Sequence, residues 1–157
     1  MTRPSTDIAT EYLMTLHVPL QAPQAVAADF EIYAARPGGW ATGPAIRGEV
    51  VAPTADWLRA MPNGTRRLDV RLSIKADDGS IIFVSYVGRI VTPEAVAARY
   101  LAGETIGPDQ HYFVIAPTFE TASKTHGWLN DIVAIGKMVS SKEGEDGHVR
   151  YDIFAVK

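Results

Sequence analysis

The sequence predicts an all-β fold, an antiparallel barrel or sandwich of about eight to ten strands with one short helix. Residues 66–76 alternate most clearly, because Leu68, Val70, Leu72 and Ile74 share one face and charged or polar residues occupy the other. The 13 glycines and 10 prolines are spread along the chain, which is typical of short strands joined by turns. Only one segment has helical periodicity, so a helical or α/β architecture is excluded.

Three segments before this strand also alternate. They are residues 11–18, with Tyr12, Met14, Leu16 and Val18 on one face; residues 29–36, with Phe30, Ile32 and Ala34; and residues 43–52, with Ile46, Gly48 and Val50. Each has the length and the period-two pattern of a strand with one buried face. The sequence does not indicate which face points inward.

The second half of the chain continues the pattern. Asp77-Asp78-Gly79 predicts a hairpin turn, because Asp-Gly tolerates positive φ, and residues 80–90 are expected to pair with 66–76. A helix is predicted from Thr92 as N-cap, with Pro93 in the first turn, to Gly103. The remaining predicted strands are residues 111–119, 128–139 and 148–156, with a hairpin loop at 143–147.

Length and composition restrict the function classes. The 157 residues suit one domain, residues 1–157, with a flexible N-terminus at 1–8. The net charge of −3 argues against nucleic acid and membrane surfaces as partners. There is no cysteine, which excludes disulfides and thiolate chemistry. No segment is apolar enough for a membrane span or a secretory signal, so a cytoplasmic protein is expected.

The sequence offers no cofactor or metal motif. The four histidines, His17, His111, His126 and His148, have no ligand-pair spacing, so no metal site is expected. The glycines at 38, 39 and 43 are not followed by a helix, which argues against a phosphate-binding loop.

Several polar and aromatic residues have two possible roles. Asp56 beside Trp57 could form an acid–base group with an apolar wall, or a turn carboxylate next to a core aromatic. Glu120, after Phe119 and near Trp128, could be a second acid or a solvent-facing carboxylate. Arg71, on the same face as Asp69, could line a polar floor or belong to an exposed ion pair. Asn130 could bind a ligand oxygen or cap a turn.

The order of motifs resembles one known family. The segments GGWATGPAIRGEV, ADWL, LDVRLSIKADDGSIIFVSYVG and PTFETASKTHGWLN occur in this order between Tyr12 and Phe154. Together they resemble the domain of unknown function 3237 family, also called uncharacterised protein family 0311. The resemblance implies a single β-barrel, lipocalin-like in appearance, that often forms oligomers, and it implies no activity. The motif glycines and Pro44 are expected at turns and close contacts.

The sequence leaves three function classes open. The first is a cofactor-free lyase or isomerase that acts on a small aromatic, phenolic substrate such as a lignin-type diaryl compound. Loss of a small aldehyde is one reaction that such an enzyme could catalyse. Its predicted catalytic residues are Asp56, Glu120, Arg71 and Asn130, and its substrate-binding residues are Trp57, Tyr86, Phe119 and Trp128. The alternative is a lipocalin-like carrier of a hydrophobic metabolite. The third is an interaction module. A homo-oligomer, first of all a dimer, is expected.

Overall fold

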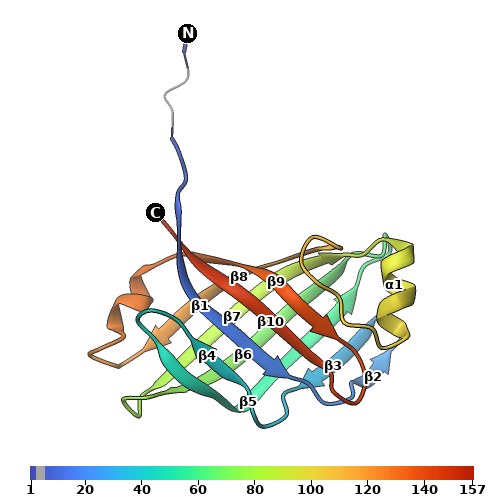
Figure 1. Cartoon of the computed structure of the whole chain (residues 1–157), viewed down its shortest axis with the longest axis horizontal. Helices are drawn as coiled ribbons and strands as arrows, with labels where there is room; N and C mark the ends of the chain where they lie inside the picture. The colour runs from blue at the N-terminus through green and yellow to red at the C-terminus, as the bar shows by residue number, and fades with distance from the viewer. Residues whose placement is uncertain (3–5) are drawn as a thin grey trace.

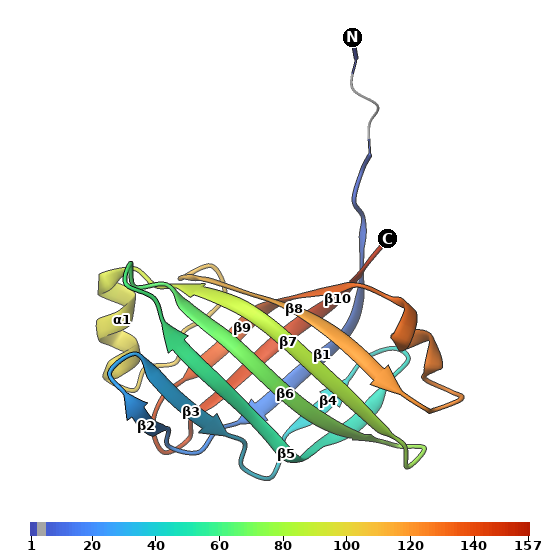
Figure 2. The same ribbon diagram turned by 180° about the vertical axis from the view of Figure 1, so that it is seen from behind.

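The computed structural model describes residues 1–2 and 6–157, and the strands close into an antiparallel barrel (Figures 1 and 2). The elements are β1 (Thr10–Pro19), β2 (Gln24–Ala27), β3 (Phe30–Ala34), β4 (Trp40–Thr42), β5 (Arg47–Ala60), β6 (Arg66–Ala76), β7 (Ile81–Val91), α1 (Glu94–Leu101), β8 (Tyr112–Thr121), the 3-10 helix η1 (Gly127–Asp131), β9 (Ala134–Lys142) and β10 (His148–Val156). The predicted all-β barrel with one short α-helix is confirmed. The flexible N-terminus predicted for residues 1–8 includes residues 3–5, which lie outside the described residues.

Eight strands form the closed barrel, in the order β5-β4-β1-β10-β9-β8-β7-β6, and pairing of β6 with β5 completes the circle. β3 pairs with the second half of β5, and β2 extends β3. The predicted hairpin is confirmed, since β6 and β7 pair from Arg66↔Ile90 to Lys75↔Ile81. β5 pairs with two strands along one edge because it is long: β4 pairs with residues 47–49 and β3 with residues 55–59.

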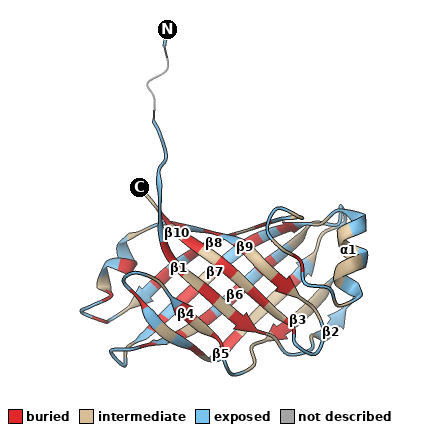
Figure 3. Ribbon diagram, viewed as in Figure 1, coloured by how far each residue is buried: buried red, intermediate tan, exposed pale blue. Residues whose placement is uncertain are grey.

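Alternation along the strands separates the barrel interior from its surface (Figure 3). In β6 the even-numbered residues from Leu68 to Ala76 are buried, whereas the odd-numbered residues are exposed or half-buried. Burial of an aliphatic side chain contributes about 1.5–3 kcal/mol. The inward row of each strand is therefore the main source of stability, and it fixes the register, because a slip by one residue would turn the row outward.

The two ends of the barrel are closed differently. At one end lie η1 and the β6–β7 hairpin (Figure 1), where Leu129 is fully buried and the Ser123 hydroxyl donates to Asp78 Oδ2 at 2.7 Å. At the other end α1 lies across the opening, with Val96 and Tyr100 packed against the core and no residue fully buried. The second end is therefore covered lightly.

Two local predictions need correction. Thr92 is not the helix N-cap: Pro93 occupies that position, and the Thr92 hydroxyl instead interacts with His111 Nδ1 at 3.1 Å. The strand predicted for residues 128–139 begins only at Ala134, because Gly127–Asp131 form η1. The amide of Asn130 stabilises this turn by donating to the Gly127 carbonyl oxygen at 2.9 Å.

Candidate functional site

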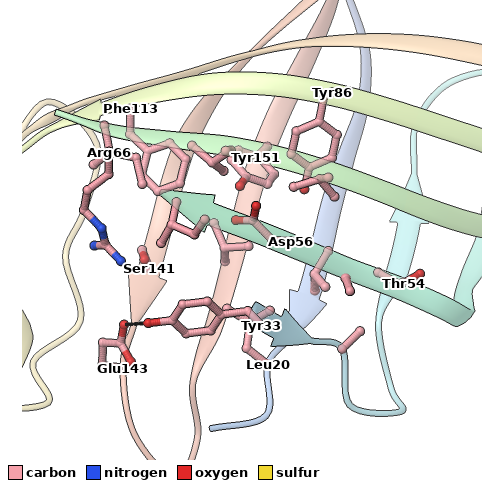
Figure 4. A pocket seen from close by; sticks show the side chains of 18 of the residues that line it. Leu20, Tyr33, Thr54, Asp56, Arg66, Tyr86, Phe113, Ser141, Glu143 and Tyr151 are labelled. Carbon is pink, nitrogen blue, oxygen red and sulfur yellow. Dashed lines mark hydrogen bonds between the residues drawn. The ribbon is translucent and has the colours of Figure 1, made fainter. Parts of the chain in front are cut away.

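A cavity occupies the half of the barrel that lies under α1 (Figure 4). Its free volume is about 50 Å³, which is space for a few water molecules or one end of a slender ligand. Most of the wall area is apolar, although nine of the 19 lining residues carry a polar or charged side-chain group. The polar and aromatic lining residues are Tyr33, Thr54, Asp56, Arg66, Tyr86, Tyr100, Phe113, Ser141, Glu143 and Tyr151.

Asp56 is one of the two carboxyl groups that line this cavity. It lies in β5 with the same inward parity as Thr54 and Leu58, which are both buried. Its Oδ1 accepts a hydrogen bond from the backbone amide of Asp69 at 3.0 Å. Burial raises the pKa of Asp56 to about 6, although the Asp69 amide and the positive charge of Arg66 act in the opposite direction. A carboxyl group with this pKa can both accept and donate a proton near neutral pH.

Two buried tyrosines face Asp56 from other strands. Tyr86 in β7 and Tyr151 in β10 form an edge-to-face pair with ring centroids 5.7 Å apart, and Phe113 packs on Tyr151 at 5.6 Å. Figure 4 shows the side chains of Asp56, Tyr86 and Tyr151 directed into the same part of the cavity. Burial raises the pKa of both tyrosines, and the charge of Asp56 raises it further. Both hydroxyls are therefore neutral donors at physiological pH.

A second polar group lies at the mouth of the cavity. The Tyr33 hydroxyl donates to Glu143 Oε1 at 2.8 Å, and the Ser141 hydroxyl donates to the Tyr100 hydroxyl oxygen at 3.1 Å. Tyr100 belongs to α1, so this contact joins the helix to β9. Burial raises the pKa of Tyr100 to about 12. The mouth is thus lined by hydroxyl groups and one carboxylate, with Arg66 beside them (Figure 4).

The structure does not bring the predicted site residues together. Asp56 and Tyr86 line the cavity, but Trp57 lies on the opposite side of β5, because successive side chains of a strand alternate. Arg71 is also on the outer face, where its guanidinium lies 5.5 Å from the Trp57 ring and 3.2 Å from Asp69 Oδ1. The predicted convergence of Trp57 and Arg71 with Asp56 is therefore wrong.

The remaining predicted residues lie away from the cavity, toward the η1 end. Glu120 is exposed on the outer face of β8, whereas its neighbour Phe119 is buried inside the barrel. Trp128 is partly exposed on η1. Asn130 Oδ1 accepts from the Thr121 amide, and its Nδ2 donates to the Thr121 carbonyl oxygen, both at 2.9 Å. As a correction to the predicted acid–base set, Glu120 is not near Asp56, and Asn130 holds a turn.

Two of the four histidines, His17 and His148, lie side by side, with ring centroids 5.2 Å apart. Among residues 1–2 and 6–157 no group of three potential metal-binding side chains is found. His17 stacks on Trp40 at 5.3 Å on the barrel wall, and burial and the neighbouring Arg150 and His148 lower its pKa to about 4. This cluster is separate from the cavity. In the same described part of the chain, no helix is long and apolar enough to cross a membrane.

Sequence reasoning missed Arg66, Tyr33, Glu143 and Tyr151. Arg66 and Tyr151 could have been found, because each shares the parity of an inward row: Arg66 precedes Leu68 and Val70, and Tyr151 falls between Val149 and Ile153. Tyr33 has the opposite parity to Ile32 and is placed inside by its pairing with Asp56. Glu143 is in a turn that carries no such signal.

The fold and the site define a small antiparallel β-barrel whose lumen is lined by the carboxyl groups of Asp56 and Glu143 and by buried tyrosines. The chain belongs to the family described as protein of unknown function (DUF3237), which matches residues 8–156. The resemblance predicted from the order of motifs is confirmed.

Relatives with the other family name support this membership. The UPF0311 protein RPA1785 of Rhodopseudomonas palustris is 30% identical over 99 residues, which are 63% of this chain and 65% of the relative. A UPF0311 protein of Clostridium acetobutylicum is 31% identical over 91 residues, 58% of each chain. The chain therefore covers less than two thirds of the length of these relatives.

Solved structures share the fold over nearly the whole chain. The R. palustris protein, of unknown function, superimposes with a TM-score of 0.84 at 24% identity, covering 98% of this chain and all of that one. A β-barrel-like protein of Acinetobacter baumannii gives 0.77 at 26% identity, covering 99% and 100%. A protein of Penicillium herquei, described as an enzyme, gives 0.65 at 20% identity and covers both chains fully.

Proposed function

We propose that this protein is a cofactor-independent acid–base enzyme, an isomerase or lyase, that acts on a small phenolic or conjugated carbonyl compound in the barrel lumen. The observation that carries the proposal is the carboxyl group of Asp56, held among apolar walls beside the hydroxyls of Tyr86 and Tyr151. Ionisation of a carboxyl group in such a place costs stability even with one hydrogen bond from the Asp69 amide, so this group needs a reason other than folding. Enzymes place perturbed carboxyl groups in clefts for proton transfer.

The proposed chemistry needs only proton transfers. The carboxylate of Asp56 takes a proton from the carbon next to a carbonyl group, the C–H electron pair forms a carbon–carbon double bond, and the C=O π pair moves to the oxygen. The Tyr86 or Tyr151 hydroxyl donates a hydrogen bond to the oxyanion that forms. Returning the proton to another carbon completes an isomerisation, and expelling a leaving group completes an elimination. The combination of an aspartate base with a tyrosine donor in an apolar pocket is also used by ketosteroid isomerase.

The size of the lumen favours a single-ring substrate. A free volume of about 50 Å³ admits one planar end of a ligand, and the rest would extend toward the mouth under α1. A lignin-type diaryl compound, which could lose a small aldehyde by the same proton transfers, requires α1 to move away. The P. herquei protein supports catalysis in this fold, because it is described as an enzyme.

A carrier is the second candidate, and the apolar lining favours it. The two functions differ in what Asp56 does after the ligand is bound. A carrier needs the carboxyl group only to orient its ligand, whereas an enzyme transfers a proton through it.

Deuterium incorporation distinguishes the two candidates across a range of compounds. A panel of phenols and enones is incubated with the protein in D₂O, and exchange at carbon is followed by NMR. We expect exchange with at least one compound. In the Tyr86→Phe variant the rate should fall about 10²–10³-fold, as for loss of one oxyanion donor. The control is Tyr112→Phe, since Tyr112 is exposed outside the barrel. Binding of panel compounds without any exchange would contradict the enzyme and favour the carrier.

A further inference from the structure

Arg66 is a cation in the lumen that has no side-chain partner among the described residues. Arg66 lies on the inward-facing side of β6, with Leu68 and Val70, and its side chain lines the cavity near the mouth (Figure 4). Its guanidinium makes no hydrogen bond or ion pair with any residue in the described part of the chain. A guanidinium group has five N–H donors and cannot lose its charge in a protein. The nitrogens of Arg66 are not among the enclosed side-chain atoms that lack a partner, so these donors can be reached from the lumen, and a carboxylate there would replace water on them.

Other partly buried arginines of the barrel do have partners. Arg36 donates to the backbone carbonyl oxygens of Leu20 and Gly147 at 2.8 and 3.0 Å, and Arg150 donates to His17 Nδ1 at 3.3 Å. Arg67, the neighbour of Arg66 in sequence, is exposed on the outer face, where water hydrates it. Arg66 therefore combines an inward position with free donors.

The carboxylates of the lumen do not occupy these donors. Glu143 Oε1 accepts from the Tyr33 hydroxyl instead, and Asp56 accepts from the Asp69 amide. Neither carboxylate forms an ion pair with Arg66 in the described chain. Arg66 nevertheless lies close enough to affect Asp56, Tyr33 and Tyr100 electrostatically. Its charge is thus directed into the cavity, and its hydrogen-bonding capacity is available to a ligand.

The spacing along β6 fits a ligand with two different ends. Asp56 pairs with Val70, four residues from Arg66, which corresponds to about 13 Å along the strand. The arginine side chain extends into the lumen and shortens this span. A planar acid can therefore place its carboxylate at Arg66 and its ring or conjugated carbonyl near Asp56. Arginine binds a carboxylate in a bidentate manner with good geometry.

We propose that Arg66 is the carboxylate receptor of the lumen and that the ligand is a small planar monocarboxylic acid. The proposal rests on the function proposed above, because it names the substrate class of the same site. The carboxylate end stays at the mouth, and the neutral end enters the apolar part. Arg66 is then a binding residue that selects acids over neutral compounds of the same shape.

Calorimetric binding at pH 7.5 tests this selection with two probes of nearly equal shape, 4-hydroxycinnamate and its primary amide. The wild-type protein should bind the acid more tightly. Arg66→Met should weaken binding of the acid about 10–100-fold, the effect of a lost charge-assisted hydrogen-bond pair, and change binding of the amide little. Arg66→Lys keeps the charge without the planar group and should give an intermediate loss. Arg67→Met is the matched control and should bind both probes as the wild type does.

The outcomes distinguish the proposed binding role of Arg66 from the proposed proton transfer by Asp56. Three results would overturn the proposal that Arg66 binds the carboxylate. They are equal affinity of the wild type for acid and amide, no binding of the acid, and an unchanged preference in a folded Arg66→Met variant. Circular dichroism establishes that the variants are folded. Because binding is measured without turnover, an Arg66-dependent preference together with no deuterium exchange would support the receptor and contradict the enzyme.

Discussion

Replacing Asp56 by asparagine should remove proton transfer and at the same time stabilise the protein at neutral pH. Asparagine keeps the oxygen that accepts from the Asp69 amide, but it carries no charge and cannot act as an acid or base. The exchange rate should fall about 10²–10⁴-fold, as for loss of a general base. A group that only supports the fold would lower stability when replaced, so opposite signs for activity and stability identify a functional residue.

The stability gain depends on pH in a defined direction. The pKa of Asp56 rises from 3.8 to about 6 in the folded protein, so the folded state binds the proton more tightly than the unfolded state. The contribution of Asp56 to stability is therefore fully present below pH 3.8 and is lost as the pH rises through about 6. The variant should be more stable than the wild type by about 3 kcal/mol at pH 7.5, and the difference should shrink toward pH 4.

Urea unfolding at several pH values measures this difference. The matched control is Asp131→Asn, because Asp131 is exposed at the end of η1 and does not contribute to the raised pKa of Asp56. Its stability should change little between pH 4 and 7.5 relative to the wild type. An Asp56→Asn variant that is less stable than the wild type at pH 7.5 would contradict the view that the ionised carboxyl group of Asp56 destabilises the folded protein.

Gly43→Ala should cause a large loss of stability. A Cβ at Gly43 would lie 2.0 Å from the carbonyl oxygen of Leu13 and 2.8 Å from the Cα of Met14. Both are backbone atoms of β1, so no side-chain rotation relieves the contact. The β4–β5 loop or β1 must shift, and we expect a loss of about 3 kcal/mol or more, at or above the upper end of the usual cost of overpacking.

Gly127→Ala is the control for this change. A Cβ at Gly127 meets no atom within 4 Å, and its backbone is not in the positive-φ region. The free energy of unfolding should change by less than about 0.5 kcal/mol, as at most surface positions. Thermal unfolding of both variants tests this prediction. A Gly43→Ala protein that unfolds at the wild-type temperature would show that close packing does not require glycine at this position.

The alternation of apolar and polar residues predicts most of the strands, and the same alternation is incompatible with the predicted site. Asp56 and Trp57 are adjacent on a strand, as are Phe119 and Glu120, so only one member of each pair can face the lumen. The predicted site includes both members of each pair, which this parity excludes. The register shift between Val51 and Ala55 inserts two residues and leaves the parity of β5 unchanged. The even-numbered residues Val50 and Leu58 are both buried, so the pattern places Asp56 rather than Trp57 in the lumen.

Among the motif residues near η1, Asn130 is predicted as a catalytic residue, whereas Asp78 is predicted to lie in a hairpin turn. The structure explains two of them by local geometry: Asn130 holds the backbone of Thr121, and Asp78 accepts from Ser80 and Ser123, which lowers its pKa to about 2. Such hydrogen bonds made by polar side chains link distant loops and leave no periodic signal. Tyr33 and Glu143, which meet at the mouth, are 110 residues apart, so their contact follows from barrel closure alone.

The central claim is that Asp56 is an acid–base group tuned by the apolar lumen, and its own titration tests this most directly. The carboxyl carbon resonance of Asp56, assigned by comparison with Asp56→Asn in protein labelled with ¹³C-aspartate, is followed by NMR from pH 3 to 9. We expect a midpoint at about pH 6, well above that of exposed aspartates. A midpoint at or below the ordinary value of 3.8 would show that the lumen does not hold back ionisation, and it would contradict the proposed role of Asp56 in proton transfer.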